Sequence, residues 1–242
     1  MTKAHDMPAP GRFQLGDITV TALSGGRLWL DGGAMFGIIP KPLWSKSVKP
    51  DEANRIPLAM TCLLIETGGT KVLVETGGGP ASKYNEKDRG FFGIGDDWIV
   101  PSLAAIGIEP QQIDIVLLTH LHFDHAGGGT RPDGVGGFVP TFPRAEYLVQ
   151  KGEWDDAVSG HAVMTGTYRQ ENLEPLEKAG LVSFVEGAAK IVEGVEVRLM
   201  PGHTRHQQGV WITGGGRTLV QPADMMPTSA HFGLRYNMAY DL

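Results

Sequence analysis

Residues 119–129 constrain the fold of this chain more than any other stretch, because they place three histidines and a carboxylate within six positions. The segment reads Thr-His-Leu-His-Phe-Asp-His-Ala-Gly-Gly-Gly and follows directly on the apolar run at residues 115–118. Imidazole nitrogens and carboxylate oxygens are ligands that a borderline divalent ion such as zinc accepts. A strand that ends in such a loop predicts a metal site at the edge of a sheet.

The spacing inside this motif indicates two metal ions. His120 and His122 stand two positions apart, so in an extended segment they point to the same side and can bind one ion together. Asp124 and His125 follow where the chain begins to turn, and adjacent residues there point in different directions, so this pair can serve a second ion. A histidine-rich surface loop without metal is the alternative, but three of only eight histidines in the chain lie here. The glycines at 127–129 fit a backbone that bends tightly beside a site.

This motif, placed after an apolar strand, resembles the His-x-His-x-Asp-His signature of the metallo-β-lactamase fold hydrolases. Members of that family add a later histidine, often in a Gly-His-Thr context, and an aspartate about twenty residues beyond it. Here Pro-Gly-His-Thr contains His203, and Asp224 follows 21 positions later. The resemblance runs from about residue 15 to the C-terminus. It implies three ligands for the first metal, two for the second and one bridge, namely His120, His122 and His203, then Asp124 and His125, and finally Asp224.

Two further residues are expected behind these ligands. In the family, a Val-Asp-Thr-Gly-like segment lies beneath the metals, and its aspartate orients a histidine ligand. The chain has Glu75 in Val-Glu-Thr-Gly, where one extra methylene should still reach a ligand; a plain glycine-rich turn is the alternative. His206 is expected to support the ligands or to act as a gate, and a solvated surface role is equally compatible. His161 is isolated in a polar segment, which favours a solvated side chain.

Two irregular segments carry bulky apolar residues without periodicity, and such loops usually cover something. The first spans residues 24–57, and the second, residues 84–95, contains Phe91 and Phe92. Each segment either covers the edge of the core, or lines a substrate cleft, or packs against a second subunit. Phe91 and Phe92 are therefore candidate cleft residues.

The remaining pattern alternates strands with helices, and an α+β fold is expected. Strands are predicted at residues 13–23, 60–74, 115–118, 145–149, 181–185, 191–192, 195–200, 210–213 and 219–221, and helices at 98–106, 153–158 and 168–179. His203 and Asp224 then each stand just past the end of a strand. The family resemblance implies a four-layer αββα sandwich with metals at one edge of two facing sheets. We expect a single domain over residues 1–242, with residues 1–11 as a flexible leader.

Composition argues against several classes of protein. The net charge is −6, the pI is about 5.7, and no lysine or arginine run resembles a nucleic-acid-binding stripe. No stretch approaches eighteen apolar residues, so no membrane span is expected, and the absence of an apolar signal region predicts a cytoplasmic protein. The single cysteine, Cys62, lies in an apolar strand and is expected to be a buried, unpaired side chain.

Within the family, the chain resembles the quorum-quenching branch that opens N-acyl homoserine lactones. The resemblance implies two divalent ions, zinc first, with manganese, cobalt or iron as alternatives. A metal-bound hydroxide would attack a lactone or related ester, and Asp124 or Asp224 would pass a proton to the leaving group. An organophosphate or aryl-ester hydrolase and a β-lactamase are alternative hydrolases. A persulfide dioxygenase with one iron, and a catalytically weak binding protein, are alternatives of other classes.

Two departures from the lactonases bear on this prediction. Lactonases carry a tyrosine three positions past the bridging aspartate, where this chain has Pro227. They also supply a last histidine to the second metal well downstream, whereas only 18 residues follow Asp224 here. We therefore expect the usual C-terminal elements to be missing, or His231 to serve as a substitute ligand. We also expect the aromatic tail at residues 231–242 to pack on another subunit in a homodimer.

Overall fold

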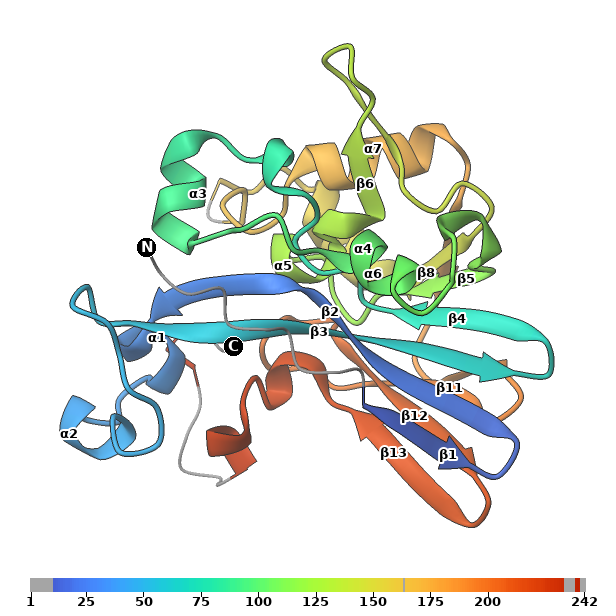
Figure 1. Ribbon diagram of the computed structural model, residues 1–242, viewed down its shortest axis with the longest axis horizontal. Coiled ribbons are helices and arrows are strands. Elements are labelled where there is room, and N and C mark those ends of the chain that lie inside the picture. Colours follow the sequence, from blue (N-terminus) through green and yellow to red (C-terminus); the bar gives the residue numbers. More distant parts are fainter. Residues whose placement is uncertain (1–10, 163, 233–237, 240–242) are drawn as a thin grey trace.

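Two β-sheets lie face to face in the computed structural model, which describes residues 11–162, 164–232 and 238–239 (Figure 1). The larger sheet contains seven strands, in the spatial order β1 (Arg12–Leu15), β2 (Ile18–Asp31), β3 (Arg55–Thr67), β4 (Thr70–Val74), β5 (Ile115–Leu117), β8 (Glu146–Gln150) and β9 (Val182–Val185). The smaller sheet contains β10 (Ala189–Val192), β11 (Val195–Leu199), β12 (Gln208–Gly214) and β13 (Arg217–Gln221). A separate ribbon pairs β6 (Thr130–Pro132) with β7 (Phe138–Pro140).

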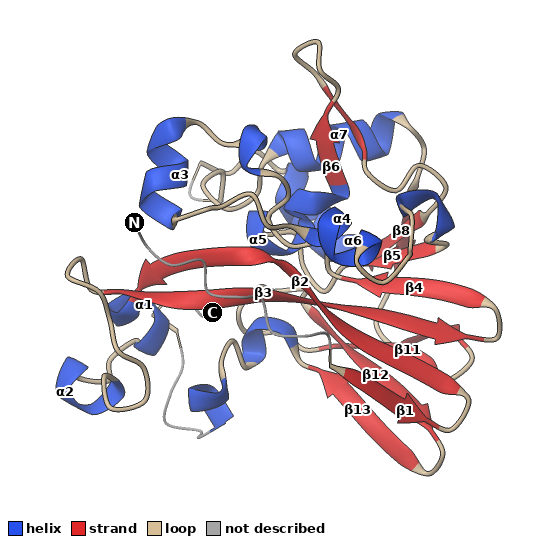
Figure 2. Cartoon of the chain, in the orientation of Figure 1, coloured by secondary structure: helices blue, strands red, loops and turns tan. Residues whose placement is uncertain are grey.

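Most of the α-helices cover one face of the seven-stranded sheet, opposite the smaller sheet (Figure 2). They are α3 (Glu86–Phe92), α4 (Ile99–Ala104), α5 (Phe123–Ala126), α6 (Lys151–Val158) and α7 (Gln170–Lys178). Two short helices, α1 (Gly32–Phe36) and α2 (Lys41–Trp44), instead follow the far end of β2. The order of the layers is therefore helices, large sheet and small sheet.

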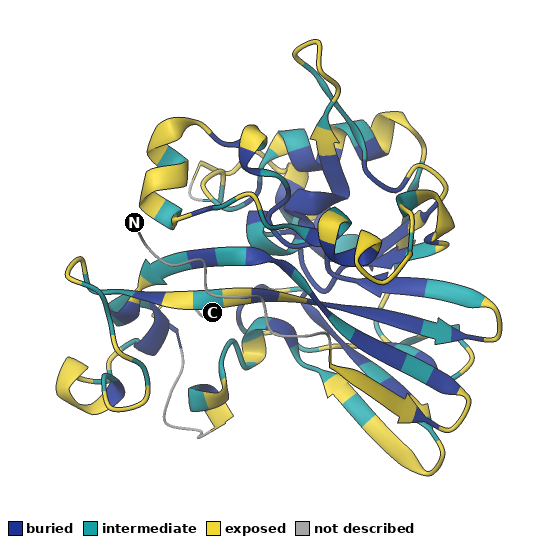
Figure 3. Cartoon of the chain, viewed as in Figure 1, coloured by how far each residue is buried: buried dark blue, intermediate teal, exposed yellow. Residues whose placement is uncertain are grey.

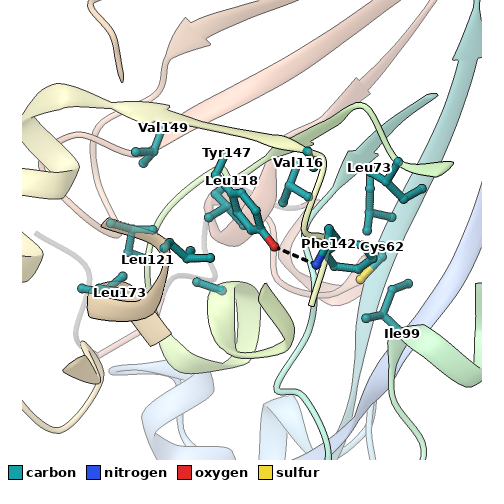
Figure 4. Packing of buried hydrophobic residues seen from close by; sticks show 14 of the residues in the cluster. Cys62, Leu73, Ile99, Val116, Leu118, Leu121, Phe142, Tyr147, Val149 and Leu173 are labelled. Carbon is teal, nitrogen blue, oxygen red and sulfur yellow. Dashed lines mark hydrogen bonds between the residues drawn. The ribbon is translucent and has the colours of Figure 1, made fainter. Parts of the chain in front are cut away.

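Alternating side chains on the central strands build two separate cores. On β3, Leu64 packs with the helix-side cluster, which also contains Cys62, while Leu63 and Ile65 pack between the two sheets. Figure 4 shows part of the helix-side cluster, where the hydroxyl of Tyr147 accepts a hydrogen bond from the amide of Phe142. Strand residues alternate between faces, and burying one such side chain stabilises the fold by about 1.5–3 kcal/mol. The expected buried, unpaired Cys62 is confirmed.

The predicted α+β fold, with two facing sheets as in the metallo-β-lactamase fold, is confirmed. Figure 3 shows the buried residues concentrated between the layers and many exposed residues along β13, the edge strand of the smaller sheet. On that sheet Trp211 is half-buried and Val220 is 41% exposed. In the part of the chain that the structure describes, the outer face of the smaller sheet is therefore partly open to solvent.

The prediction of an irregular loop over residues 24–57 was wrong at both ends of that segment. Strand β2 continues to Asp31 and pairs with β3, which begins at Arg55. Gly25 and Gly26 do not end the strand, because the register simply shifts between Ser24 and Arg27, as in a β-bulge. A Cβ atom on Gly25 would lie 2.9 Å from the Cα atom of Gly77, so the glycine permits a close approach of two chain segments.

The predicted loop at residues 84–95 was also wrong, since it contains helix α3. Asn85 caps this helix by accepting a hydrogen bond from the amide of Asp88 at 2.8 Å. The helix ends at Gly93, whose φ of 62° is the left-handed conformation that favours glycine. The bulky pair of phenylalanines therefore lies on a short helix.

Parts of the expected leader and tail lie outside the described residues, namely 1–10, 233–237 and 240–242. Within the tail, Met238 is buried beside Phe36 and Trp44, while Phe232 is 74% exposed. No helix in the described part of the chain has the length and apolar character needed to cross a membrane.

Candidate metal centre

The histidine motif begins where buried strand β5 ends. Strands β4, β5, β8 and β9 run parallel, so their carboxyl ends meet at one edge, where α/β folds gather ligands. Extended backbone carries His120 and His122 past β5, and the chain then turns into the one-turn helix α5, which contains Asp124 and His125. The two pairs therefore leave the backbone from different conformations, although the rings of His120 and His125 lie close together, with their centroids 4.0 Å apart.

Close backbone contacts hold the histidine motif against the segment that follows β4. The carbonyl of His125 accepts hydrogen bonds from both the amide and the hydroxyl of Thr76, at 2.8 and 2.9 Å. The amide of Gly128 donates to the carbonyl of Gly77 at 2.8 Å, and a Cβ atom on Gly128 would lie 2.2 Å from the Thr76 carbonyl oxygen. The expected tight bend at the glycines is thus confirmed.

The other two candidate ligands come from the smaller sheet. His203 lies between β11 and β12, and Asp224 lies in a short 3₁₀ turn after β13. A hydrogen bond of 2.9 Å from the amide of Gln208 to the carbonyl of Thr119 joins the two sheets at this end. All six predicted ligands therefore meet at one edge.

The ligand atoms form two adjacent groups. His120, His122 and His203 make the first, in which His203 Nε2 lies 2.9 Å from His122 Nδ1. His120, His125 and Asp224 make the second, and in each group the ligand atoms lie within 4.8 Å of one another.

The carboxylate of Asp224, a member of the second group, also faces a ring of the first group. Its Oδ2 is 3.5 Å from Nε2 of His203, and its Oδ1 is 3.2 Å from Nε2 of His125. The same His125 nitrogen lies 3.7 Å from Oδ2 of Asp124. One carboxylate thus faces one imidazole from each group, which is the geometry expected of a bridging ligand.

The electrostatics of the cluster fit metal binding. Burial, with the nearby imidazoles, lowers the pKa values of His120 and His122 well below the usual range, so both rings are neutral. His120 is fully buried, and its Nε2 atom has no hydrogen-bond partner in the structure. A buried polar atom without a partner is costly, and a metal ion would satisfy it.

The pKa values of the charged residues in the cluster indicate which carboxylate keeps its negative charge. Burial raises the pKa of Asp224, but the imidazoles of His125 and His203 outweigh it and hold the pKa at about 2. Burial lowers the pKa of His125, yet the surrounding carboxylates raise it well above its usual range. Burial raises the pKa of Asp124. The negative charge is therefore held most firmly on Asp224.

Glu75 lies directly behind the second group. Its side chain is buried, and Oε1 accepts a hydrogen bond from the amide of Thr119 at 2.9 Å while Oε2 lies 3.2 Å from Nδ1 of His125. Its φ of 65° is left-handed, which costs a residue other than glycine about 1–3 kcal/mol. This strained backbone is held in place by contacts to the ligand segment.

The other histidines considered lie away from the ligands. The His231 ring is buried against Phe36, with Nε2 2.8 Å from the carbonyl of Met35 and Nδ1 2.8 Å from the hydroxyl of Thr228. The alternative of His231 as a substitute ligand is therefore wrong, because both its nitrogens are engaged elsewhere. His206 lies 3.9 Å from a carboxylate oxygen of Asp156 at the surface, and His161 is exposed.

A cavity of about 590 Å³ opens above the candidate metal centre. Its floor is formed by ligand residues and Glu75, and its rim includes Arg205, which pairs with Asp156 at 2.8 Å. One wall is apolar and contains Leu28, Leu30, Leu58, Met60, Phe92 and Met226. Phe92 therefore lines the cavity as expected, whereas Phe91 is 63% exposed and is not part of the lining.

Sequence reasoning missed part of this wall and two residues that contact the ligand segments, Tyr168 and Glu153. The alternation of Leu28 and Leu30 is a strand signal, but the preceding glycine pair was read as a strand end. Tyr168 and Glu153 were assigned only to helices, and nothing in the linear pattern marks their contacts with the ligand segments.

Comparison with known proteins agrees with this geometry. Residues 55–236 match the family described as the Metallo-beta-lactamase superfamily. The chain is 29% identical over 169 residues to an N-acyl homoserine lactonase of Bacillus cereus, and the match covers 66% of this chain. It spans only 60% of the length of that relative.

Two solved structures are similar over most of the chain. A probable metal-dependent hydrolase from Staphylococcus aureus is 33% identical, with a TM-score of 0.88 and coverage of 95% of this chain and 80% of the other. An N-acyl homoserine lactone hydrolase, solved with the product N-hexanoyl-L-homoserine at its catalytic metal centre, is 26% identical with a TM-score of 0.61. That similarity covers 86% of this chain and 75% of the other.

Proposed function

Because the chain belongs to the metallo-beta-lactamase superfamily, we propose that it is a metal-dependent hydrolase that opens a lactone, with N-acyl homoserine lactones as the first candidates. The single observation that carries this proposal is the meeting of two groups of ligand atoms, joined by Asp224, at the floor of an apolar-walled cavity. A relative that covers most of this chain holds a hydrolysed lactone at its own metal centre.

Six residues would hold the ions. His120, His122 and His203 would bind the first ion, His125 and Asp124 the second, and Asp224 both. Zinc is the proposed metal, because three neutral imidazoles around one point suit it well. When bound, two such ions lower the pKa of water to about 7 and polarise the carbonyl under attack.

The protein's own groups would orient these ligands and handle protons. Glu75 accepts a hydrogen bond from Nδ1 of His125. The Nε2 atom of that ring is then available to bind a metal ion. Asp124 and Asp224 are the carboxylates on the floor, and either can pass a proton to the leaving oxygen of an opened ring. No serine or cysteine nucleophile is required for this reaction.

The apolar wall favours a substrate with a hydrophobic chain. Strands β2 and β3 supply Leu28, Leu30 and Leu58 to the lining of the same cavity as the candidate ligands. An acyl chain along this wall would leave its ester group at the ligands, where the lining is polar. Binding pockets commonly combine an apolar lining with a few placed polar groups in this way.

A second candidate is the hydrolysis of an aryl ester or phosphotriester. Pro227 lines the cavity at the position where lactonases carry a tyrosine, so that hydroxyl is absent from this part of the cavity. The hydroxyl of Tyr168 is also engaged, because it donates to Glu153 at 2.9 Å. A substrate with a better leaving group would need less help from such a hydroxyl.

Metal analysis together with a substrate panel tests these proposals. The purified protein would be chelated, reloaded with zinc, manganese, cobalt or iron, and assayed on lactones of several chain lengths, aryl esters, phosphotriesters and a β-lactam. We expect two metal equivalents and metal-dependent lactone turnover. One iron with no hydrolysis would favour the dioxygenase alternative, and two metals without any turnover would favour a binding protein.

The cellular setting is part of the same proposal. Cys62 is a free, buried thiol, which fits the cytoplasmic location that we propose. We also propose a homodimer in which the C-terminal tail, residues 231–242, packs on the other subunit. Much of this tail lies outside the described residues.

A further inference from the structure

The three candidate ligands of the first metal come from two segments with different origins. His120 and His122 follow β5 of the larger sheet, whereas His203 lies between two strands of the smaller sheet. The distance between these segments sets the size of the metal site. A group that binds both segments would therefore control how well they fit an ion.

Glu153, in the first turn of helix α6, binds both segments with one carboxylate. Its Oε1 accepts a hydrogen bond of 3.0 Å from the amide of Leu121, which lies between the two histidines of the first segment. Its Oε2 accepts one of 2.7 Å from the hydroxyl of Thr204, the residue after His203.

A third donor connects the same carboxylate to a ligand ring. The hydroxyl of Tyr168 donates to Oε1 of Glu153 at 2.9 Å, and the Tyr168 ring centroid lies 5.0 Å from that of His122. Tyr168 and Thr204 are each 4% exposed. The carboxylate thus binds a group next to a ligand in each segment, and it also binds a tyrosine whose ring lies beside that of His122.

The burial of the Glu153 carboxylate carries a cost in folding free energy. Glu153 is 0% exposed, and a carboxylate is buried at a large desolvation cost that its hydrogen bonds only partly offset. An apolar residue of similar size would avoid this cost but would leave the buried amide of Leu121 and two hydroxyls without an acceptor. Three donors on a fully buried carboxylate fix geometry in a way that an apolar side chain cannot.

We infer that Glu153 is a positioning residue that holds the His120–His122 segment and the His203 loop at the separation required by the first metal. This inference rests on the proposed metal-dependent function. It predicts that metal affinity depends on hydrogen bonds made by residues that are not ligands.

The test measures metal affinity in isosteric variants. Zinc dissociation constants, by competition with a chromophoric chelator, would be determined for Thr204→Val, Thr204→Ser and Glu153→Gln. We expect the first-site constant to rise about tenfold or more in Thr204→Val and Glu153→Gln, because loss of such supporting contacts weakens metal binding by about 10–100-fold. Thr204→Ser keeps the hydroxyl and should stay within about twofold of the parent protein.

Matched variants separate this effect from a general loss of stability. Thr67→Val removes a buried hydroxyl that donates to the carbonyl of Glu193, and Tyr147→Phe removes one that donates to the carbonyl of Gly129. Both should leave the zinc constant unchanged. The absorption spectrum of the cobalt-loaded protein gives a second readout, since its bands report ligand geometry and should shift in Thr204→Val and not in Thr67→Val.

The outcomes distinguish the inference from the function on which it rests. If the parent protein binds zinc at the first site and Thr204→Val and Glu153→Gln bind it equally well with unchanged cobalt spectra, the role of Glu153 is overturned and the proposed function stands. If the parent protein binds no metal, the proposed function fails, and the inference fails with it.

Discussion

Replacing Glu75 with glutamine changes one atom of a buried side chain and should disable the second group of ligands. The carboxylate accepts on both sides, from the amide of Thr119 at 2.9 Å and from Nδ1 of His125 at 3.2 Å. A glutamine offers one acceptor and one donor in the same space. It can therefore accept a hydrogen bond from only one of these two partners.

Both orientations of the new amide are unfavourable. If its oxygen faces Thr119, its NH₂ group faces Nδ1 of His125, and the ring must carry its proton on Nε2, the atom that would bind metal. If its oxygen faces His125, two donors meet at the buried amide of Thr119. Leaving a buried donor without a partner costs about 1–3 kcal/mol, which corresponds to a loss of roughly 5–150-fold in metal affinity.

Isothermal titration of the metal-free protein with zinc would measure this loss. We expect the affinity of the second equivalent to fall by about 10–100-fold while the first equivalent is less affected. Glu66→Gln, on the neighbouring strand β3, is the matched control and should bind zinc as the parent does. Two zinc equivalents of unchanged affinity in Glu75→Gln would refute the reasoning, because the proposed orientation of His125 would then be unnecessary.

Three further predictions follow from the same structure. Asp224→Ala should lose both hydrolysis and at least one metal equivalent, measured by elemental analysis, and full activity in a metal-free variant would contradict the assignment. Gly128→Ala places a Cβ atom 2.2 Å from a carbonyl oxygen and should lower the free energy of unfolding in urea by about 1–3 kcal/mol, whereas Gly90→Ala has open space and should not. Burial lowers the pKa of Lys83 from 10.5 to about 7. Between these two pH values the folded protein therefore binds fewer protons than the unfolded chain. The free energy of unfolding should therefore rise as the pH increases from 7 to 10, and a Lys83→Met variant that kept this rise in urea titrations would exclude Lys83 as its source.

Four of the six candidate ligands, at positions 120, 122, 124 and 125, could be predicted from local spacing, whereas His203 and Asp224 came from the family resemblance. Two-residue spacing in extended backbone sets the direction of His120 and His122, and the glycines that follow permit the tight turn. The central strands were likewise predictable, since residues such as Leu63 and Leu64 alternate between two cores. These signals act over a few residues and do not depend on the rest of the fold.

Other features were decided only by tertiary structure. The glycine pair before Leu28 predicts a strand end when read alone, yet pairing with β3 turns it into a bulge and extends the sheet along the cavity. His231 is near Asp224 in sequence, but packing against Phe36 holds it elsewhere.

The sequence by itself determined which side chains can bind metal and which strands carry them, because ligand type and strand periodicity are properties of short segments. The family resemblance already placed Glu75 behind those ligands, but only the tertiary structure decided that Glu153 lies there too, 32 positions along the chain from its amide partner Leu121. Contacts over such separations depend on how sheets and helices pack, and a single sequence carries no local signal for them.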